Sequence, residues 1–445
     1  MSLERELAAV VGGAHLLTDP DVTSSYGQDW TGRFQSIPRA VVRPSSTDEV
    51  TVIVEKCVSH GVALVPQGGN TGLTGGSVPD GDALVVSLTR LRSISEIETG
   101  WDQVNVESGA SLAEVQQQAA MAGYFLPIDH SARDTATAGG SVATNAGGAL
   151  AWRFGMTRAQ VIGLEAVLPN GSVVRRFSPL IKNNTGYDLS QLLIGSEGTL
   201  GIVTRVRFRL LPKLGAATTV LLGIASLQTA VELFAEARST SSLVAAEFLS
   251  KVSMKAVCEH LDVARPLAAD HSFYLLFEFA GPDSITDMTQ ALKGIPDEDS
   301  IVAQSEDQRR RLWSYRESLN ETVTALGGTH KFDVAVPRHR LNDFNQAIEE
   351  RFVGRRVRVF VFGHLGDGNV HLNILGPRPD EPVDAIVYQE VADLEGTISA
   401  EHGIGRIKRE WLHLAKTPGE IAAMTAIKRS LDPDNLMNPG VLLPD

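Results

Sequence analysis

The chain has 445 residues, of which 43% are hydrophobic and 21% charged, and its formal net charge at pH 7 is −13. This length exceeds what one ordinary core holds and predicts two or three domains of globular composition. The acidic charge argues against a nucleic-acid partner, because neutralising phosphates requires clustered Lys and Arg. The one basic run, Arg309-Arg310-Arg311, is expected on a solvated helix face.

The cysteine content and the lengths of the apolar runs indicate the cellular compartment of the protein. Cys57 and Cys258 are the only cysteines, so a disulfide framework is not expected and a reducing compartment fits better. The first residues, MSLERELAAVV, lack the apolar stretch and cleavage site of a signal peptide. No apolar run reaches the roughly 18 residues of a transmembrane helix. We therefore expect a cytoplasmic protein without a membrane span.

The first predicted elements are a strand at 40–44, a helix after it and a strand at 62–66. Ser46 and Glu49 have the spacing of a capping box, which marks the start of the helix. Gly61 suits the position just past its end.

A second copy of this pattern follows. A strand at 103–109 leads to a helix that begins after Ser111, with Glu114 in capping-box spacing and Gly123 at its end. The two copies predict βαβ-like units in an α+β layout.

Between these units lies a glycine-rich segment, PQGGNTGLTGG at 66–76. Glycine permits positive φ angles and close backbone approach, so successive N–H groups could converge on an anion. No Lys follows in P-loop spacing, and a turn and a strand at 82–88 follow instead of a helix, which excludes a Rossmann site. The alternative is a mobile loop without a ligand.

Two further glycine-rich segments occur at 138–148 and 195–204. In the first of them Ser141, Thr144 and Asn145 offer hydrogen bonds without bulk. Three such segments in one domain suggest a long, extended ligand, with phosphates on one segment and ring edges on the others.

The second half predicts a separate domain. LPK at 211–213 closes the first domain, and alternating strands and helices then fit a substrate-binding cap. Near the C-terminus a helix is expected to end at Asp432, which precedes Pro433. We expect boundaries that give a first domain at 1–215, a cap at 216–410 and a C-terminal segment at 411–445.

Within the cap, the stretch 363–373 reads GHLGDGNVHLN between two predicted strands. Asp367 and Gly368 form a dipeptide favoured in two-residue hairpin turns, which would place His364 directly opposite His371 on one face. Two such imidazoles can reach one metal ion at about 2.0–2.1 Å each. Asn373 would share that face. The alternative is that both histidines are ordinary core or surface residues.

Two adjacent residues, Glu401 and His402, lie in the glycine-punctuated segment TISAEHGIGRIKRE. Neighbours in extended backbone point opposite ways, so one could face a metal while the other faces elsewhere. The alternative is an ion pair in a loop.

The three glycine segments, in this order and with the longer context KNNTGYDLSQLLIGSEGTLGIVT, resemble the FAD-binding domain of the vanillyl-alcohol oxidase/p-cresol methylhydroxylase superfamily. GHLGDGNVHLN and the later EHG resemble its branch of D-lactate, glycolate and D-2-hydroxyglutarate dehydrogenases. The resemblance covers residues 20–441 approximately. It implies an α+β fold: a two-part PCMH-type FAD-binding domain, an α/β cap with an antiparallel sheet, and a C-terminal segment that returns to the flavin.

The resemblance also implies a set of FAD contacts. The first segment would cradle the pyrophosphate through Pro66, Gly68, Gly69, Asn70, Thr71, Gly72, Gly75 and Gly76. The second would line the flavin through Gly139, Gly140, Ser141, Thr144, Asn145, Gly147 and Gly148. The adenosine end would meet Gly201 and Ile202, and the ring system would meet Asn438, unless that residue only belongs to a tail after the helix. Residues 66–76 contain no His or Cys, so we expect non-covalent FAD.

For the cap, the resemblance implies that His364, His371 and Glu401 ligate Zn²⁺ or another divalent ion such as Mn²⁺. His402 would be the general base. The substrate would be held by Arg316, Asn320, Lys331 and Asn373. The hydroxyglutarate enzymes carry a Thr where this chain has Asn320, which leaves the identity of the acid open. For Arg316 the alternative is an ordinary residue on the surface of a helix.

The expected activity is oxidation of a D-2-hydroxy acid such as D-2-hydroxyglutarate or D-lactate to the 2-oxo acid. Hydride would pass to flavin N5, and electrons would pass on to an electron-transfer flavoprotein, a quinone or a cytochrome. A homodimer is possible. The alternatives are a flavin oxidase that uses O₂, a zinc hydrolase without a flavin role, and a non-catalytic flavin-binding module.

Overall fold

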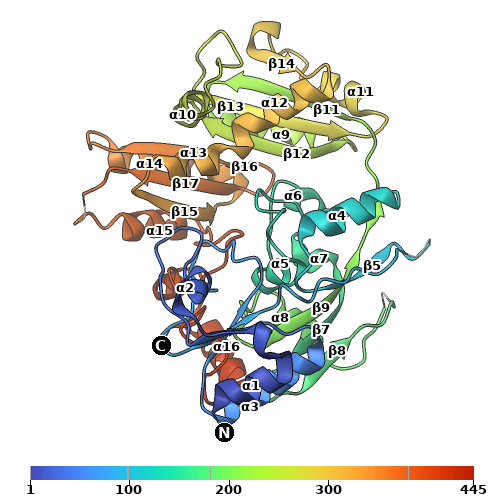
Figure 1. Cartoon of the computed structure of the whole chain (residues 1–445). Helices are drawn as coiled ribbons and strands as arrows, with labels where there is room; N and C mark the ends of the chain where they lie inside the picture. Colours follow the sequence, from blue (N-terminus) through green and yellow to red (C-terminus); the bar gives the residue numbers. More distant parts are fainter. Residues whose placement is uncertain (1, 98–99, 181, 379, 445) are drawn as a thin grey trace. The chain divides into compact units, whose positions relative to one another are not determined.

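The computed structural model of the chain describes residues 2–97, 100–180, 182–378 and 380–444 (Figure 1). It divides into two compact units. The first comprises residues 1–148, 154–213 and 401–445, and the second comprises residues 149–153 and 214–400. The chain thus returns to the first unit after Ala400, whereas the sequence pattern suggested 410. Within this returning part, the N–H of Arg406 donates to Thr74 O at 2.9 Å.

One sheet of the first unit has the strand order β1-β2-β4-β3. Its strands are β1 (Leu16–Leu17), β2 (Ala40–Val42), β4 (Leu84–Ser87) and β3 (Leu64–Gln67). β2 and β3 both pair in parallel with β4, so β2, the helix α3 (Thr47–Ser59) and β3 form the first expected βαβ unit, with β4 between its strands.

The other main sheet of this unit is antiparallel in the order β5-β9-β7-β8. Its strands are β5 (Gln103–Glu107), β9 (Ile202–Arg209), β7 (Val161–Val167) and β8 (Val173–Arg176). The second expected βαβ unit is therefore wrong. After the helix α4 (Leu112–Met121) the chain enters β6 (Tyr124–Phe125), which pairs with β10 (Leu211–Pro212) and not with β5.

The helices α3 and α4 of the first unit begin where the sequence has capping residues. Ser46 Oγ accepts from Glu49 N at the start of α3, and Ser111 with Glu114 forms a complete capping box on α4. The remaining helices are α1 (Leu3–Val11), α2 (Pro20–Thr23), α5 (Ala138–Thr144), α7 (Thr157–Gln160), α8 (Leu189–Leu193) and α16 (Pro418–Leu431), with 3₁₀ turns η1 (Gly13–His15), η2 (Ser24–Tyr26) and η5 (Arg409–Leu414). As predicted, α16 ends at Asp432.

The second glycine segment differs from expectation, since residues 138–144 form the helix α5 and not a loop. Thr137 Oγ1 caps this helix by accepting from Gly140 N. Only the residues from Asn145 onward are irregular, and Asn145 itself has a φ of 50°. The cap outweighs the low helix propensity of two adjacent glycines.

The second unit is built on one antiparallel sheet in the order β14-β11-β13-β12-β16-β17-β15. Its strands are β11 (Ala217–Ile224), β12 (Leu243–Ser250), β13 (Phe273–Ala280), β14 (Ser300–Val302), β15 (Thr329–Ala335), β16 (Arg358–His364) and β17 (Asn369–Leu375). The antiparallel sheet predicted for the cap is confirmed, and its centre is fully buried.

Helices cover this sheet, and Figure 1 shows α9 to α12 lying against β11 to β13. They are α9 (Leu227–Ala237), α10 (Lys251–Leu261), α11 (Ser284–Ala291), α12 (Glu306–Glu317), α13 (Leu319–Ala325), α14 (Leu341–Phe352) and α15 (Val383–Asp393), with turns η3 (Asp297–Asp299) and η4 (Arg338–Arg340). The short α6 (Ala151–Phe154) brings in Trp152, whose Nε1 donates to Val244 O at 3.0 Å. Across the ranges that the structure describes, no helix has the length and apolarity to cross a bilayer.

Candidate active site

The two histidines of the hairpin lie on one face of the sheet, as predicted, but not directly opposite each other. β16 pairs with β17 so that His364 faces Asn369 and Phe362 faces His371. The hairpin loop is therefore the four residues 365–368, and the predicted two-residue turn is wrong. The register moved by two residues, which leaves the faces unchanged because side chains alternate with a period of two.

The two imidazoles are diagonal neighbours that meet at their tips. His364 Nε2 lies 3.4 Å from His371 Nε2, and both side chains are buried. Two nitrogens that each lie about 2.0–2.1 Å from a tetrahedral zinc would be about 3.3–3.4 Å apart. The observed separation therefore fits a shared metal ion without rearrangement of the hairpin.

Behind His364 lies a buried carboxylate that the sequence did not single out. Glu247 on β12 is directly opposite His364, and its Oε1 lies 2.7 Å from His364 Nδ1. Its other oxygen forms an ion pair with Arg316 Nε at 2.7 Å, and all three side chains are buried. A carboxylate on Nδ1 fixes the tautomer that points the Nε2 lone pair away from it, the arrangement typical of a metal-ligating histidine.

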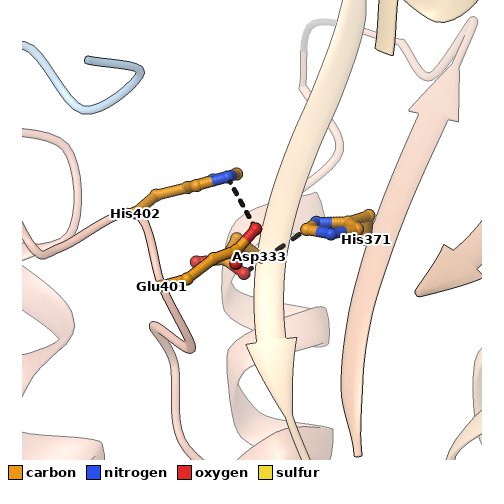
Figure 2. A group of neighbouring side chains, drawn as sticks. All are labelled: Asp333, His371, Glu401 and His402. Atoms are coloured by element: carbon orange, nitrogen blue, oxygen red, sulfur yellow. Dashed lines mark ion pairs between the residues drawn. The ribbon is translucent and has the colours of Figure 1, made fainter. Parts of the chain in front are cut away.

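Directly opposite His371 on β15 lies a second acid, Asp333, which is also buried (Figure 2). Its Oδ1 is 3.9 Å from His371 Nδ1 and accepts a hydrogen bond of 2.9 Å from Asn369 Nδ2. Asn369 Nδ2 also donates to Val334 O, which ties β17 to β15 through a side chain. His364 is thus hydrogen-bonded to a buried carboxylate, and His371 lies within ion-pair distance of another.

The predicted substrate residues lie on the same sheet or beside it. Lys331 on β15 is directly opposite Asn373 on β17, on the face that carries His371. Lys331 Nζ donates to Thr324 Oγ1 at 2.6 Å, and burial lowers the pKa of this lysine below its ordinary value. Arg316 stands over the Phe362 ring, with its guanidinium carbon 5.1 Å from the ring centroid. Asn320 lies half-buried in α13.

Glu401 and His402 belong to the first unit, in an irregular segment without helix or strand (Figure 2). His402 Nε2 and Glu401 Oε1 form an ion pair at 3.5 Å. Glu401 also packs on Gly147, where a Cβ atom would come within 3.1 Å of its Oε2. Burial lowers the pKa of the nearby His130, and the Glu401 charge opposes that shift.

The three glycine segments of the first unit meet in space. Gly68 and Gly69 pack on the segment before α5, where a Cβ on Gly69 would lie 1.9 Å from Thr135 O. The backbone of Gly195 donates to Val142 O at 3.0 Å, which joins the third segment to the second. Only glycine permits the close approach at Gly69, and with the backbone hydrogen bond from Gly195 the segments form one continuous backbone surface.

Two orphaned polar atoms mark where a ligand fits this surface. Ser141 Oγ and Asn438 Oδ1 are buried and have no hydrogen-bond partner in the part of the chain that the structure describes. Buried polar atoms of this kind normally have a partner, so a bound group with hydrogen-bonding edges suits them. Both residues are among those the resemblance assigned to FAD. The Ile202 side chain lies fully in the core, so a contact from this residue would use its backbone.

Sequence reasoning missed Glu247, Asp333 and Asn369. Glu247 interrupts the otherwise apolar strand VAAEFLS, and a charge at a core position of a buried strand signals a paired group. Its partners could not be named because they lie far away in the sequence.

Comparison with known proteins adds an independent observation. A family profile described as "FAD binding domain" matches residues 38–176, and one described as "FAD linked oxidases, C-terminal domain" matches residues 214–442. D-2-hydroxyglutarate dehydrogenase from Stutzerimonas stutzeri is 36% identical, over 98% of this chain and 97% of its own. The mitochondrial D-2-hydroxyglutarate dehydrogenase of Danio rerio is 35% identical, over 96% of this chain and 83% of its own.

A solved structure supports the fold. The crystal structure of p-cresol methylhydroxylase with substrate bound superimposes with a TM-score of 0.77 over 98% of this chain and 95% of its own, at 15% identity. At that identity the likeness concerns the fold alone, and the expected PCMH-type architecture is confirmed.

Proposed function

The chain belongs to the family of FAD-linked D-2-hydroxyglutarate dehydrogenases, and we propose that it oxidises D-2-hydroxyglutarate, or a close D-2-hydroxy acid, with a divalent metal ion at its hairpin. The family membership establishes FAD-dependent oxidation of a D-2-hydroxy acid. The substrate, the metal and the residue roles are proposals.

The observation that carries the proposal is the polar row on one face of β15, β17 and β16. It contains two imidazoles with their nitrogens 3.4 Å apart, each backed by a buried carboxylate, and a Lys–Asn pair one step further along the strands. Burying a charged group costs free energy unless the group pairs with an opposite charge or binds a ligand. The row fits a metal ion with a carboxylate-bearing substrate beside it.

We assign the metal to His364, His371 and Glu401. The third ligand is supported by chain continuity: the N–H of Ala400 donates to Asp333 O at 3.4 Å, and Glu401 is the next residue. Consecutive Cα atoms lie about 3.8 Å apart, so Glu401 starts close to the acid behind His371. Two histidines and one glutamate are a donor set typical of catalytic zinc. Such an ion, when bound, supplies Lewis-acid activation of the substrate hydroxyl.

The chain's own residues hold the substrate. Lys331 and Asn373 would bind a carboxylate, and Arg316 would direct its Nη groups to the same end while its Nε pairs with Glu247. Asn320, one helical turn before Thr324 in α13, would donate from its amide. Fixing the acid in this way orients the C2–H bond for transfer.

His402 would accept the hydroxyl proton on its imidazole, the side chain that most often acts as a general base. FAD, when bound, supplies the acceptor of the C2 hydride at N5. In the first unit Ser141 and Asn438 would hydrogen-bond this cofactor through their orphaned oxygens.

We propose an electron carrier, which could be an electron-transfer flavoprotein, a quinone or a cytochrome, with O₂ as the alternative. Peroxide yield measured against reduction of an artificial dye distinguishes these cases. The cytoplasmic location and a homodimer stay predictions, to be checked by cell fractionation and by light scattering.

The test of the function is an anaerobic bleaching screen of the purified yellow protein. The panel holds the D and L forms of 2-hydroxyglutarate, lactate, malate and mandelate, together with glycolate. Rapid bleaching by D-2-hydroxyglutarate and not by its L form is expected. Bleaching by only the L acids, or by none, would contradict the proposal.

A further inference from the structure

Glu197 occupies a backbone position that favours glycine. Its φ is 52°, in the left-handed region, and it stands between Gly195 and Gly198, which have φ angles of 80° and 73°. For a residue with a Cβ this backbone conformation is strained. The side chain is also almost fully buried. A strained, buried acid in a glycine segment points to a task for its carboxylate.

That task is visible in the hydrogen bonds of the carboxylate. Its two oxygens accept the N–H groups of Ile404 and Gly405, each at 2.8 Å. Gly403 lies so close that a Cβ atom there would come within 2.9 Å of Glu197 Oε1. Burial raises the pKa of this carboxyl, whereas the two N–H groups and the nearby Lys408 charge lower it. Glu197 thus clamps the irregular segment that begins just after His402.

The backbone of the same residue reaches the flavin-binding segments. Glu197 N donates to Ala143 O in α5 at 2.8 Å, and Glu197 O accepts from Asn438 Nδ2 at 2.7 Å. Asn438 Nδ2 also donates to Gly76 O at 2.9 Å, in the first glycine segment. One residue therefore joins all three parts of the proposed flavin surface to the segment after His402.

We propose that Glu197 is the positioning residue of the proposed base: its carboxylate fixes residues 403–405, and through them His402, against the flavin-binding surface. The inference rests on the proposed role of His402 in the reaction. Glu197 itself touches neither substrate nor the reacting atoms.

A near-isosteric substitution of Glu197 distinguishes the effect of the carboxylate from the effect of side-chain size. In E197Q one side-chain oxygen still accepts an N–H group, but an amide N–H₂ then faces the other, so one hydrogen bond becomes a donor–donor repulsion. E197D keeps two acceptor oxygens on a side chain shorter by one methylene. The matched control is E165Q, because Glu165 is another buried acid of the first unit whose side-chain partners Thr47, Arg175 and Thr204 lie outside residues 403–405.

The experiment measures two quantities on the FAD-loaded protein. One is the rate constant and half-saturation for anaerobic flavin reduction by D-2-hydroxyglutarate. The other is hydrogen exchange at the amides of Ile404 and Gly405, with thermal unfolding recorded for every variant. The variants are E197Q, E197D, E165Q and H402A.

We expect E197Q to lose about 10²-fold in the reduction rate constant, since a small misplacement of a catalytic group has that effect. The half-saturation should stay within about twofold, exchange at the two amides should accelerate, and E197D should recover part of the rate. In E165Q both quantities should match the wild type.

Three results would overturn the inference. They are a flavin-reduction rate constant in E197Q equal to that of the wild type, a loss of this rate constant in E165Q as large as in E197Q, or rapid hydrogen exchange at both amides in the wild type. The last needs no variant and holds even if E197Q does not fold. H402A reports on the proposed function separately. If it reduces flavin at the wild-type rate, His402 is not the base, whatever Glu197 does.

Discussion

His364 and His371 lie diagonally across the β16–β17 hairpin, with their Nε2 atoms 3.4 Å apart. The hairpin loop spans four residues, so the histidines do not face each other directly, yet their tips converge. Each imidazole has a buried acid on its Nδ1 side, Glu247 for His364 and Asp333 for His371. The contact is a hydrogen bond of 2.7 Å for His364 and an ion pair at 3.9 Å for His371, and these two buried acids distinguish the pair from histidines that are only neighbours.

The H364A and H371A variants should each lose the bound divalent metal while keeping FAD. A catalytic zinc with one of its protein ligands removed is held by only two. Elemental analysis of the purified protein and its visible flavin spectrum measure the two outcomes. H330A is the matched control. His330 also lies on β15, but its side chain points to the face opposite that of Lys331 and Asp333, where it pairs with Asp384. Metal retained in H364A and H371A would refute the assignment.

E247Q should weaken both stability and metal binding. Breaking a buried ion pair leaves Arg316 without its partner and costs about 3–5 kcal/mol. Loss of the carboxylate behind His364 should also lower metal affinity by about 10–100-fold.

The control for this variant is E278Q, since Glu278 is a second acid of the same sheet, buried and paired with Arg309. Both variants should unfold at lower temperature, but only E247Q should release metal to a competing chelator. Equal chelator sensitivity would mean that Glu247 acts on stability alone.

Binding of the hydroxy acid should weaken at high pH because of Lys331. Burial lowers the pKa of this lysine from its ordinary value of 10.5, so its charge is lost at a lower pH than in an exposed lysine. The half-saturation for D-2-hydroxyglutarate should therefore rise as pH increases through that lowered pKa.

Two variants test the origin of this pH effect. K331M should raise the half-saturation by about 10–100-fold at neutral pH, the worth of a hydrogen bond to a charged group. In K331R the side chain stays charged, so the half-saturation should rise less at high pH than in the wild type. The exposed Lys293 supplies the control variant K293M. A pH profile that K331R leaves unchanged would assign the titration to another group.

G69A should reduce FAD content by pushing the first glycine segment away from the second. The new Cβ would lie 1.9 Å from Thr135 O, a backbone atom that cannot turn aside. Overpacking of this kind costs about 1–3 kcal/mol. G13A is the control, because a Cβ there meets nothing within 4 Å. Flavin titration of the apoprotein measures the effect, and wild-type affinity in G69A would contradict it.

Much of the local structure followed from the sequence. Ser46 and Ser111 start helices where capping residues predict them, and Asp432 ends one before a proline. The prediction that His364 and His371 share a face survived an error in the turn, since a shift of two residues preserves alternation. The motifs of the glycine segments also identified the flavin family correctly.

Other predictions failed because they depended on distant partners. β5 looked like the start of a βαβ unit, but it pairs with β9, which lies about a hundred residues later. Residues 138–144 read as a loop, whereas the cap from Thr137 makes them a helix. Local pattern fixes which residues prefer an element and cannot fix what that element pairs with.

The sequence by itself determined the chemistry available to this protein: the glycine segments, the paired histidines and the EHG stretch, because backbone flexibility and side-chain type are local properties. Only the tertiary structure decided which acids support that chemistry. Glu247 and Asp333 back the two imidazoles, and Glu197 clamps the segment after His402. These contacts join residues far apart in the chain, and burial of a charge is tolerated only where the fold brings its partner within hydrogen-bonding distance.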